Sequence, residues 1–162
     1  MRQRARVQGL ALSGILLLGH VAMASSVAPA KPSQIVALIS SGGAPACPLA
    51  GKKIDSQIEP DGSFQPFSVP TGQVLVVTGF DWTVDGLLAS QTAKVALLLE
   101  SASAADPVFQ DGAIADFLGT AWKGAAVPNV IVKPVPGAVF CVSSAGGTLG
   151  YSVVHGFLTK DK

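Results

Sequence analysis

The sequence predicts an all-β protein, built as an antiparallel β-sandwich of about seven to nine strands in a jelly-roll or similar Greek-key arrangement. Two observations lead to this fold class. One long stretch alternates with a period of two, which is the period of a β-strand. Turn residues then interrupt the rest of the chain at intervals of about 10 to 15 residues, which is typical of short strands joined by turns.

The long stretch, Phe67 to Asp85, is the segment around which the other strands are expected to assemble. From Val74 to Val84 every second residue is apolar or nearly so. The alternate set is apolar in the first half and polar in the second, where it includes Asp81. A strand that begins inside a sandwich and ends near its rim has this pattern.

Shorter runs bounded by Gly and Pro predict the remaining strands. They are Gln34–Ser40, Lys52–Ile58, Phe64–Val69, Thr92–Ser101, Val130–Val135, Ala138–Ser143 and Thr148–Thr159. Pro66 marks its strand as an edge strand. The Ala-rich run at 92–101 would also suit a helix, but its alternation, with Lys94 and Glu100 on one side, favours a strand. Pro107 to Lys123 has no clean period, so we expect a long connection there with a short strand or a helical turn, and the structure of residues 107–128 stays open.

The N-terminus has the features of an export signal. Three arginines in residues 2–6 precede an apolar run from Leu10 to Leu18, and Ala22-Met23-Ala24 is a pattern that signal peptidase accepts. Cleavage is expected before Ser25, which places the protein in the periplasm or outside the cell. The alternative is an uncleaved anchor, for which the apolar run is shorter than the roughly 20 residues that a span needs.

The predicted organisation is therefore a signal peptide at 1–24, a flexible linker at 25–33 and a single β-sandwich domain at 34–162. All three arginines of the chain lie in the leader, so the remaining 8 lysines against 10 acidic residues leave a net charge of −2. A chain without arginine and with this charge is a poor ligand for nucleic acid or for an anionic membrane. No membrane span is expected after cleavage, while the apolar composition permits a homo-oligomer.

Cys47 and Cys141 are the only cysteines. In an exported chain two cysteines most simply form one disulfide, and the alternative is two free buried thiols. They lack the CxxC spacing and the partner histidines of a metal site. We expect the bond to hold the irregular segment Ser41–Gly51 against the C-terminal strands.

The segment FSVPTGQVLVVTGFDW, Phe67 to Trp82, resembles the F-x-V-P-x-G-x-x-L-V-V strand entry of uncharacterised secreted bacterial β-sandwich proteins. The segment VVHGFLT, Val153 to Thr159, is similar to the closing strand often seen in that group. The resemblance covers about a fifth of the chain after the leader. It implies an exported bacterial β-sandwich and brings no catalytic residue with it.

Candidate catalytic residues are few. His155 is the one histidine outside the leader, and its alternation with Tyr151, Val153 and Phe157 places it on an apolar strand face. A histidine in that position is more often a core or interface residue than a general base. One histidine also excludes a histidine-rich metal site. We therefore expect no catalytic residue, no enzymatic activity and no cofactor.

Carboxylates and aromatic residues are the remaining candidates for a binding site. Asp81 and Asp85 lie on the polar side of the central strand, where they could contact a ligand. Asp106, Asp111 and Asp116 are weak candidates for calcium, because no D-x-D-x-D-G order is present. The face alternation predicts core positions for Trp82 and Tyr151. Trp122, which we place in a loop, is the candidate for an exposed aromatic that contacts a ligand.

The sequence thus favours a non-enzymatic exported domain with a structural, adhesive or binding role in the cell envelope or outside the cell. The alternative is a carbohydrate-binding or carbohydrate-active module that calcium could assist. Neither the ligand nor a partner follows from the residues alone.

Overall fold

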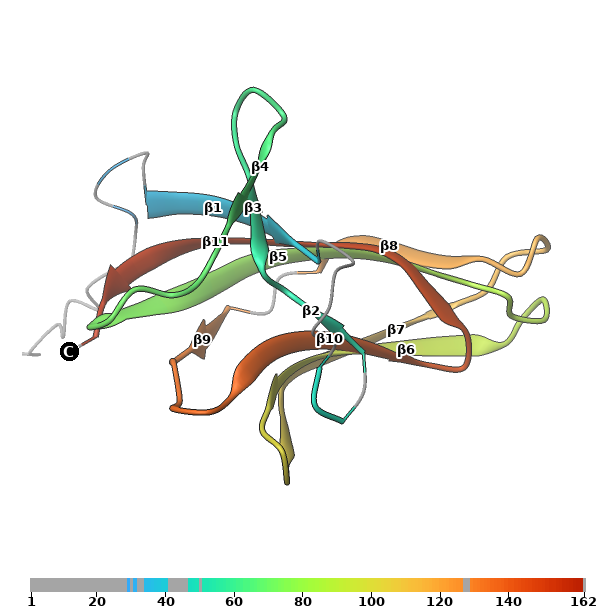
Figure 1. Ribbon diagram of the computed structural model, residues 1–162. Helices are drawn as coiled ribbons and strands as arrows, with labels where there is room; N and C mark the ends of the chain where they lie inside the picture. The colour runs from blue at the N-terminus through green and yellow to red at the C-terminus, as the bar shows by residue number, and fades with distance from the viewer. Residues whose placement is uncertain are drawn as a thin grey trace, which may run out of the picture.

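A computed structural model describes residues 29, 31, 34–40, 47–49, 51–126 and 129–161. The predicted signal peptide, and the predicted linker apart from residues 29 and 31, lie outside the described residues. The described part of the chain forms two antiparallel sheets packed face to face, with no helix, so the predicted antiparallel β-sandwich is confirmed (Figure 1). Within the described residues no helix could therefore cross a membrane.

The larger sheet has seven strands. They are β1 (Ile35–Ile39), β3 (Ser56–Ile58), β4 (Phe64–Pro66), β5 (Gln73–Asp85), β8 (Ala121–Ala126), β9 (Val130–Val132) and β11 (Thr148–Lys160). Their order is β4-β3-β1-β11-β5-β8, and β9 pairs with β5 beside the first half of that strand. The central strand predicted from the sequence is thus β5, which pairs along its length with β11 and lies inside the sheet. β4 with Pro66 is an edge strand, as predicted.

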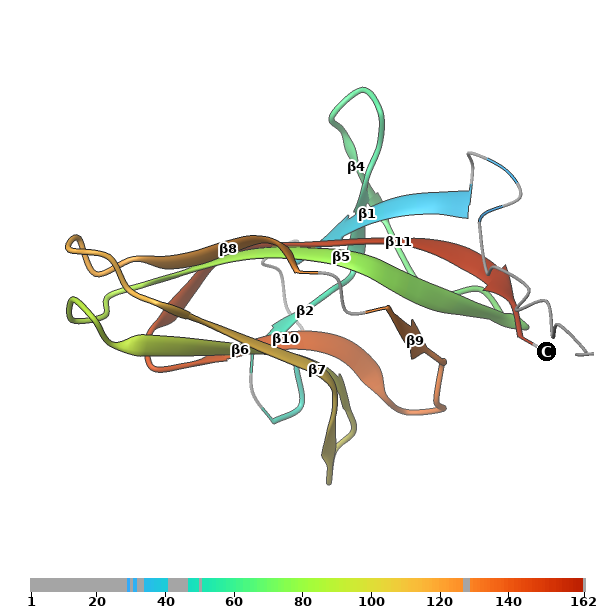
Figure 2. The ribbon, with the colours of Figure 1, turned by 180° about the vertical axis from the view of Figure 1, so that it is seen from behind.

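The smaller sheet has four strands. They are β2 (Lys52–Lys53), β6 (Thr92–Glu100), β7 (Ala105–Ile114) and β10 (Val139–Ala145), in the order β2-β10-β6-β7. Figure 2 shows the two sheets from behind as separate layers, with the β3–β4 hairpin extending away from the larger one. The core between the layers is one cluster, in which Phe80, Trp82 and Val84 of β5 are fully buried against Val95 and Leu97 of β6.

Two predicted boundaries were wrong. The predicted strand Lys52–Ile58 divides into β2 and β3, which belong to different sheets. The chain crosses between them at the buried Ile54, whose N–H bonds to Phe140 O while the next N–H bonds to Ile39 O. The stretch Pro107–Lys123, expected to be a long connection with a short strand or a helical turn, instead contains most of β7 and the start of β8, joined by a short loop.

A β-bulge at Thr78 explains why a single period-two alternation does not describe the whole of β5. His155 pairs with Gly79 and Gly156 pairs with Val77, so Thr78 is an extra residue on this strand. An extra residue reverses which face the following side chains occupy. The core residues of β5 are accordingly Leu75 and Val77 before the bulge, and Phe80, Trp82 and Val84 after it.

Candidate functional site

The outer face of the seven-stranded sheet, turned away from the core, brings together predicted ligand residues. Trp122 lies on β8 opposite Thr83, and two residues further along β8 Gly124 lies beside Asp81. A Cβ built on Gly124 would lie 3.7 Å from Asp81 Oδ1 and 3.8 Å from Trp122 Cζ3. Because glycine has no side chain, nothing from this position separates the indole ring from the carboxylate. The structure therefore pairs Asp81 with Trp122 on one open surface.

Trp122 is exposed, as predicted, with 64% of its surface accessible, but it lies in a strand and not in a loop. The pairing of β8 with β5 holds the backbone at Trp122 in place, so the indole ring extends from a regular strand of the sheet. By contrast Trp82, the other tryptophan, is fully buried in the core, as predicted. Trp122 is therefore the tryptophan available to a ligand.

His155 was predicted on an apolar face, and this prediction was wrong. The ring lies on the exposed outer face, where Nε2 is 2.9 Å from Asp81 Oδ2. Gly79 of the neighbouring strand permits this arrangement, because its Cβ would lie 3.3 Å from His155 Cβ and 3.4 Å from Cδ2. The physical reason for the error is the set of irregularities along the β5–β11 ladder, which shift the alternation that the sequence suggests.

Tyr151 was also wrongly assigned to the core: it is 51% exposed. It lies where two residues of β11, Gly150 and Tyr151, stand opposite Thr83 alone, so the strand has one extra residue there, and the Tyr151 N–H donates to Thr83 Oγ1 at 3.1 Å. At the same end of the face Asp85 Oδ1 accepts a hydrogen bond of 2.9 Å from Thr120 Oγ1. The hydroxyl groups of Thr83 and Thr120 and the Asp85 carboxylate thus lie on this part of the face, while Tyr151 lines a separate hollow with Ile39, Ser40 and Lys52.

A groove lies beside His155 on the same face. Its volume is about 540 Å³, and it lies between the start of the β3–β4 hairpin (residues 57–60) and the floor formed by β1, Thr78 and His155. This space adjoins the Asp81–His155 pair. No sequence pattern predicts it, because it depends on the hairpin leaving the plane of the sheet (Figure 1).

Among the three calcium candidates, Asp111 joins the two sheets. It lies on β7, its Oδ1 accepts from Lys123 Nζ at 2.6 Å, and its Oδ2 accepts from Trp82 Nε1 at 3.3 Å. Burial favours the neutral carboxyl, but the hydrogen bonds from Lys123, the Gly112 N–H and Trp82 outweigh burial and hold the pKa of Asp111 below its ordinary value. Its oxygens are therefore engaged by protein donors.

The other two calcium candidates, Asp116 and Asp106, differ from Asp111 in their surroundings. Asp116 Oδ1 accepts the N–H groups of Leu118 and Thr120 at 2.8 and 3.0 Å, which closes the loop between β7 and β8. Asp106 is exposed near the start of β7. Within the described residues the one group of three potential metal ligands is Cys47, Glu100 and Cys141, which includes none of these aspartates.

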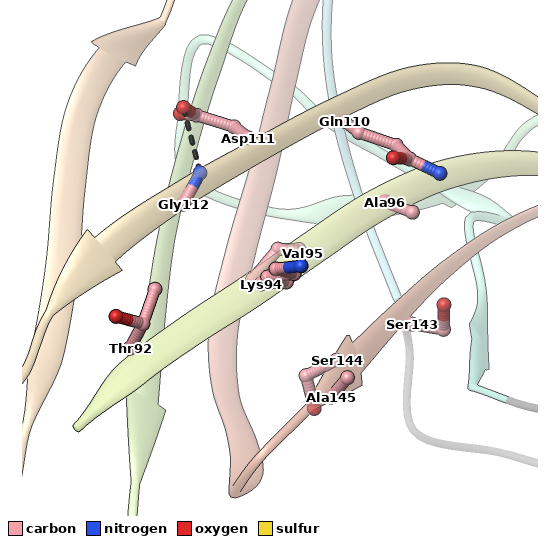
Figure 3. Close-up of a pocket in the computed structure, with 10 residues that line it drawn as sticks. All are labelled: Thr92, Lys94, Val95, Ala96, Gln110, Asp111, Gly112, Ser143, Ser144 and Ala145. Carbon is pink, nitrogen blue, oxygen red and sulfur yellow. Dashed lines mark hydrogen bonds between the residues drawn. The ribbon is translucent and has the colours of Figure 1, made fainter.

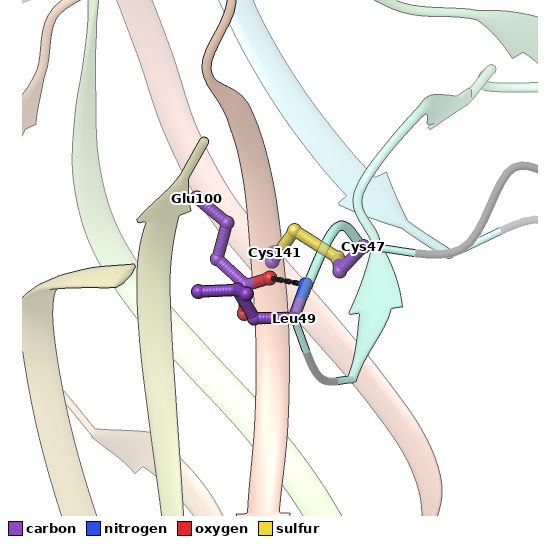
Figure 4. Close-up of a disulfide and its surroundings, with 4 residues drawn as sticks. All are labelled: Cys47, Leu49, Glu100 and Cys141. Atoms are coloured by element: carbon purple, nitrogen blue, oxygen red, sulfur yellow. Dashed lines mark hydrogen bonds between the residues drawn. A yellow bond between two sulfur atoms is a disulfide. The ribbon is translucent and has the colours of Figure 1, made fainter. Parts of the chain in front are cut away.

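The two cysteines of that group form the predicted disulfide. Cys47 and Cys141 are bonded, with Cα atoms 6.1 Å apart, as the prediction required (Figure 4). Beside them lies Glu100, fully buried although it is on the side of β6 predicted to be polar, and its Oε2 accepts the Leu49 N–H at 2.9 Å. Since both sulfurs are used in the bond, this cluster is a structural clamp.

A shallow hollow on the outer face of the four-stranded sheet was missed by sequence reasoning. It has a volume of about 420 Å³, and Lys94 of β6 lies in it with Gln110 on one side and Ser143 on the other (Figure 3). Its neighbours in the ladder, Gly112 and Ala145, are small, which leaves the space open around the lysine. The sequence contains the lysine and the small residues, but only strand pairing places them together.

Comparison of the chain with protein-family models, with curated proteins and with solved structures returns no match. The fold and the residues described above are therefore the basis for any functional inference.

Proposed function

We propose that this protein is an exported, non-enzymatic binding domain that takes its ligand on the outer face of the seven-stranded sheet. The observation that carries the proposal is the exposed Trp122 ring beside Asp81, with Gly124 leaving the space between them open. An exposed indole on a regular strand offers a rigid apolar surface at little cost in conformational entropy. The adjacent Asp81 carboxylate can accept hydrogen bonds from a ligand and so orient it on the ring.

A carbohydrate is the ligand class that this face fits best. Sugar rings present apolar C–H patches that stack on an aromatic face, and hydroxyl groups that bond to carboxylates and imidazole. Both kinds of group are present, since the exposed Trp122 lies beside Asp81, and Asp81 pairs with His155. Calcium is not needed in this proposal, because these side chains can contact a sugar directly.

Binding is favoured over hydrolysis by the geometry of the carboxylates. Asp81 and Asp85 are four residues apart on one strand, which separates their Cα atoms by about 13 Å at the usual rise of a strand. In glycosidases the two carboxyl groups are about 5 to 9.5 Å apart and flank one bond of the substrate, whereas here Asp81 bonds to His155 and Asp85 bonds to Thr120. The Asp81–His155 pair does not complete a nucleophilic site either, because no hydroxyl or thiol of the described residues bonds to the His155 ring.

The test is binding of the purified protein to an array of glycans, followed by titration of any sugar that binds. Trp122→Ala is expected to abolish binding while leaving the melting temperature nearly unchanged, because the side chain is exposed. Phe64→Ala is the matched control, since Phe64 is equally exposed on β4 and should be silent in both measurements. An array on which the wild type binds nothing would remove the carbohydrate proposal. Full binding by Trp122→Ala would remove this face as the site.

A further inference from the structure

Three large apolar side chains are exposed together at one end of the sandwich. Leu88 belongs to the loop between β5 and β6, and Phe117 and Leu118 belong to the loop between β7 and β8; together they are called the apolar tip. Their exposed fractions are 71%, 85% and 74%. Figures 1 and 2 both show these two loops side by side at the end of the molecule opposite the C-terminus. Clustered exposed apolar side chains are uncommon on a monomer and mark interaction sites.

The two loops are held together by their backbones. The Leu87 N–H donates to Gly119 O at 3.0 Å, the Ser90 N–H donates to Ala115 O at 3.1 Å, and the Ala115 N–H donates to Gln91 O at 2.8 Å. At Gly119 a Cβ would lie 2.2 Å from Leu87 O, so only glycine permits this close approach. The tip is therefore a fixed surface, and the exposure of its side chains is a property of the fold.

Many backbone N–H groups around the tip are hydrogen-bonded within the loops. The N–H of Leu88 donates to Gln91 Oε1 and that of Leu118 donates to Asp116 Oδ1, both at 2.8 Å. Asp85 and Asp116 are the only charged residues of segments 85–92 and 114–121, and both carboxylates accept hydrogen bonds from Thr120. An apolar surface whose neighbouring backbone is already bonded can leave water at low cost.

We propose that the apolar tip inserts into the interfacial region of a lipid bilayer with neutral headgroups and anchors the protein there. All three side chains are highly exposed and none of them lines a hollow described above, so a deformable surface suits them better than a rigid protein pocket. The absence of Lys and Arg from both loop segments excludes attraction to anionic lipids as the main force. The proposal is independent of the ligand face around Trp122.

The test is flotation of the purified protein with vesicles of phosphatidylcholine alone and of phosphatidylcholine with phosphatidylglycerol. The N-terminus is sequenced first, because the leader is itself apolar, and all variants carry the same N-terminus. We expect binding to both preparations with little dependence on salt. The double variant Phe117→Ser, Leu118→Ser should lower the partition coefficient by about tenfold or more, because each lost side chain removes apolar area that leaves water on insertion.

The matched control is Phe64→Ser with Ile131→Ser, which removes two similarly exposed apolar side chains away from the tip and should leave the partition unchanged. Equal losses in the two double variants would overturn the proposal. So would binding that requires phosphatidylglycerol and disappears in salt. If the wild type stays free of lipid and sedimentation velocity shows an oligomer that the tip variant lacks, the tip is an interface between copies and the lipid proposal is wrong. Sugar binding by the tip variant is expected to persist.

Discussion

The outer face of each sheet carries a carboxylate, but one carboxylate is buried and the other is accessible to solvent. On the four-stranded sheet the segment at Cys47–Leu49 crosses the outer face, and Glu100 beneath it is fully buried. On the seven-stranded sheet no segment among the described residues buries Asp81 in this way, and its carboxylate pairs with an exposed histidine. Strand alternation decides on which face a residue lies. Whether a charged residue on that face is available to a ligand depends on which segment crosses over it.

The largest effect on the difference between the two faces should come from Cys141→Ser, which releases the segment Cys47–Leu49 from the four-stranded sheet. The bond joins residues 94 positions apart, and the chain-entropy model gives roughly 4 to 5 kcal/mol for so long a loop. We expect the melting temperature to fall by on the order of 10 °C or more. Limited proteolysis should then cut near residues 47–51 first. Unchanged melting and unchanged protection would contradict a structural role for the disulfide.

A smaller effect is expected from Glu100→Ala, which removes the buried carboxylate under the same segment. The Leu49 N–H loses its acceptor and a space is left beside the disulfide, so the free energy of unfolding should fall by about 1 to 3 kcal/mol. Glu100→Gln is the control, because its side-chain oxygen can still accept that hydrogen bond and it should lose less. Urea denaturation of the three proteins compares them directly. If the Glu100→Ala variant and the wild type unfolded at the same urea concentration, the claim that the buried Glu100 stabilises this face would be wrong.

The smallest effect is expected from His155→Gln on the open face. The pair with Asp81 is solvent-exposed, and exposed pairs contribute between about 0 and 1 kcal/mol to stability. The same urea experiment should therefore place this variant within about 1 kcal/mol of the wild type. A loss as large as that of Glu100→Ala would show that the outer face is covered in solution.

Much of the fold could be predicted because most strands have a clear period and end at Gly or Pro. The disulfide was predicted from two cysteines in a chain whose N-terminus resembles an export signal. Errors arose where the ladder is irregular: the bulge at Thr78 and the one extra residue near Tyr151 each reverse the face alternation, and nothing in the residue types marks them. The burial of Glu100 and the hollow at Lys94 could not be predicted either, because both depend on contacts between segments distant in the sequence.

The position of β11 has a consequence for the order of folding. This strand lies between β1 and β5 at the centre of the seven-stranded sheet, although it is formed by residues 148–160. Strands β1 and β5 are made first, but they have no shared neighbour until β11 has been synthesised. Pairing between such distant segments is slow, because the loop entropy is lost before the contacts form. We therefore expect the larger sheet to assemble only after synthesis of nearly the whole chain, which leaves the nascent polypeptide extended for longer than a protein built from local hairpins.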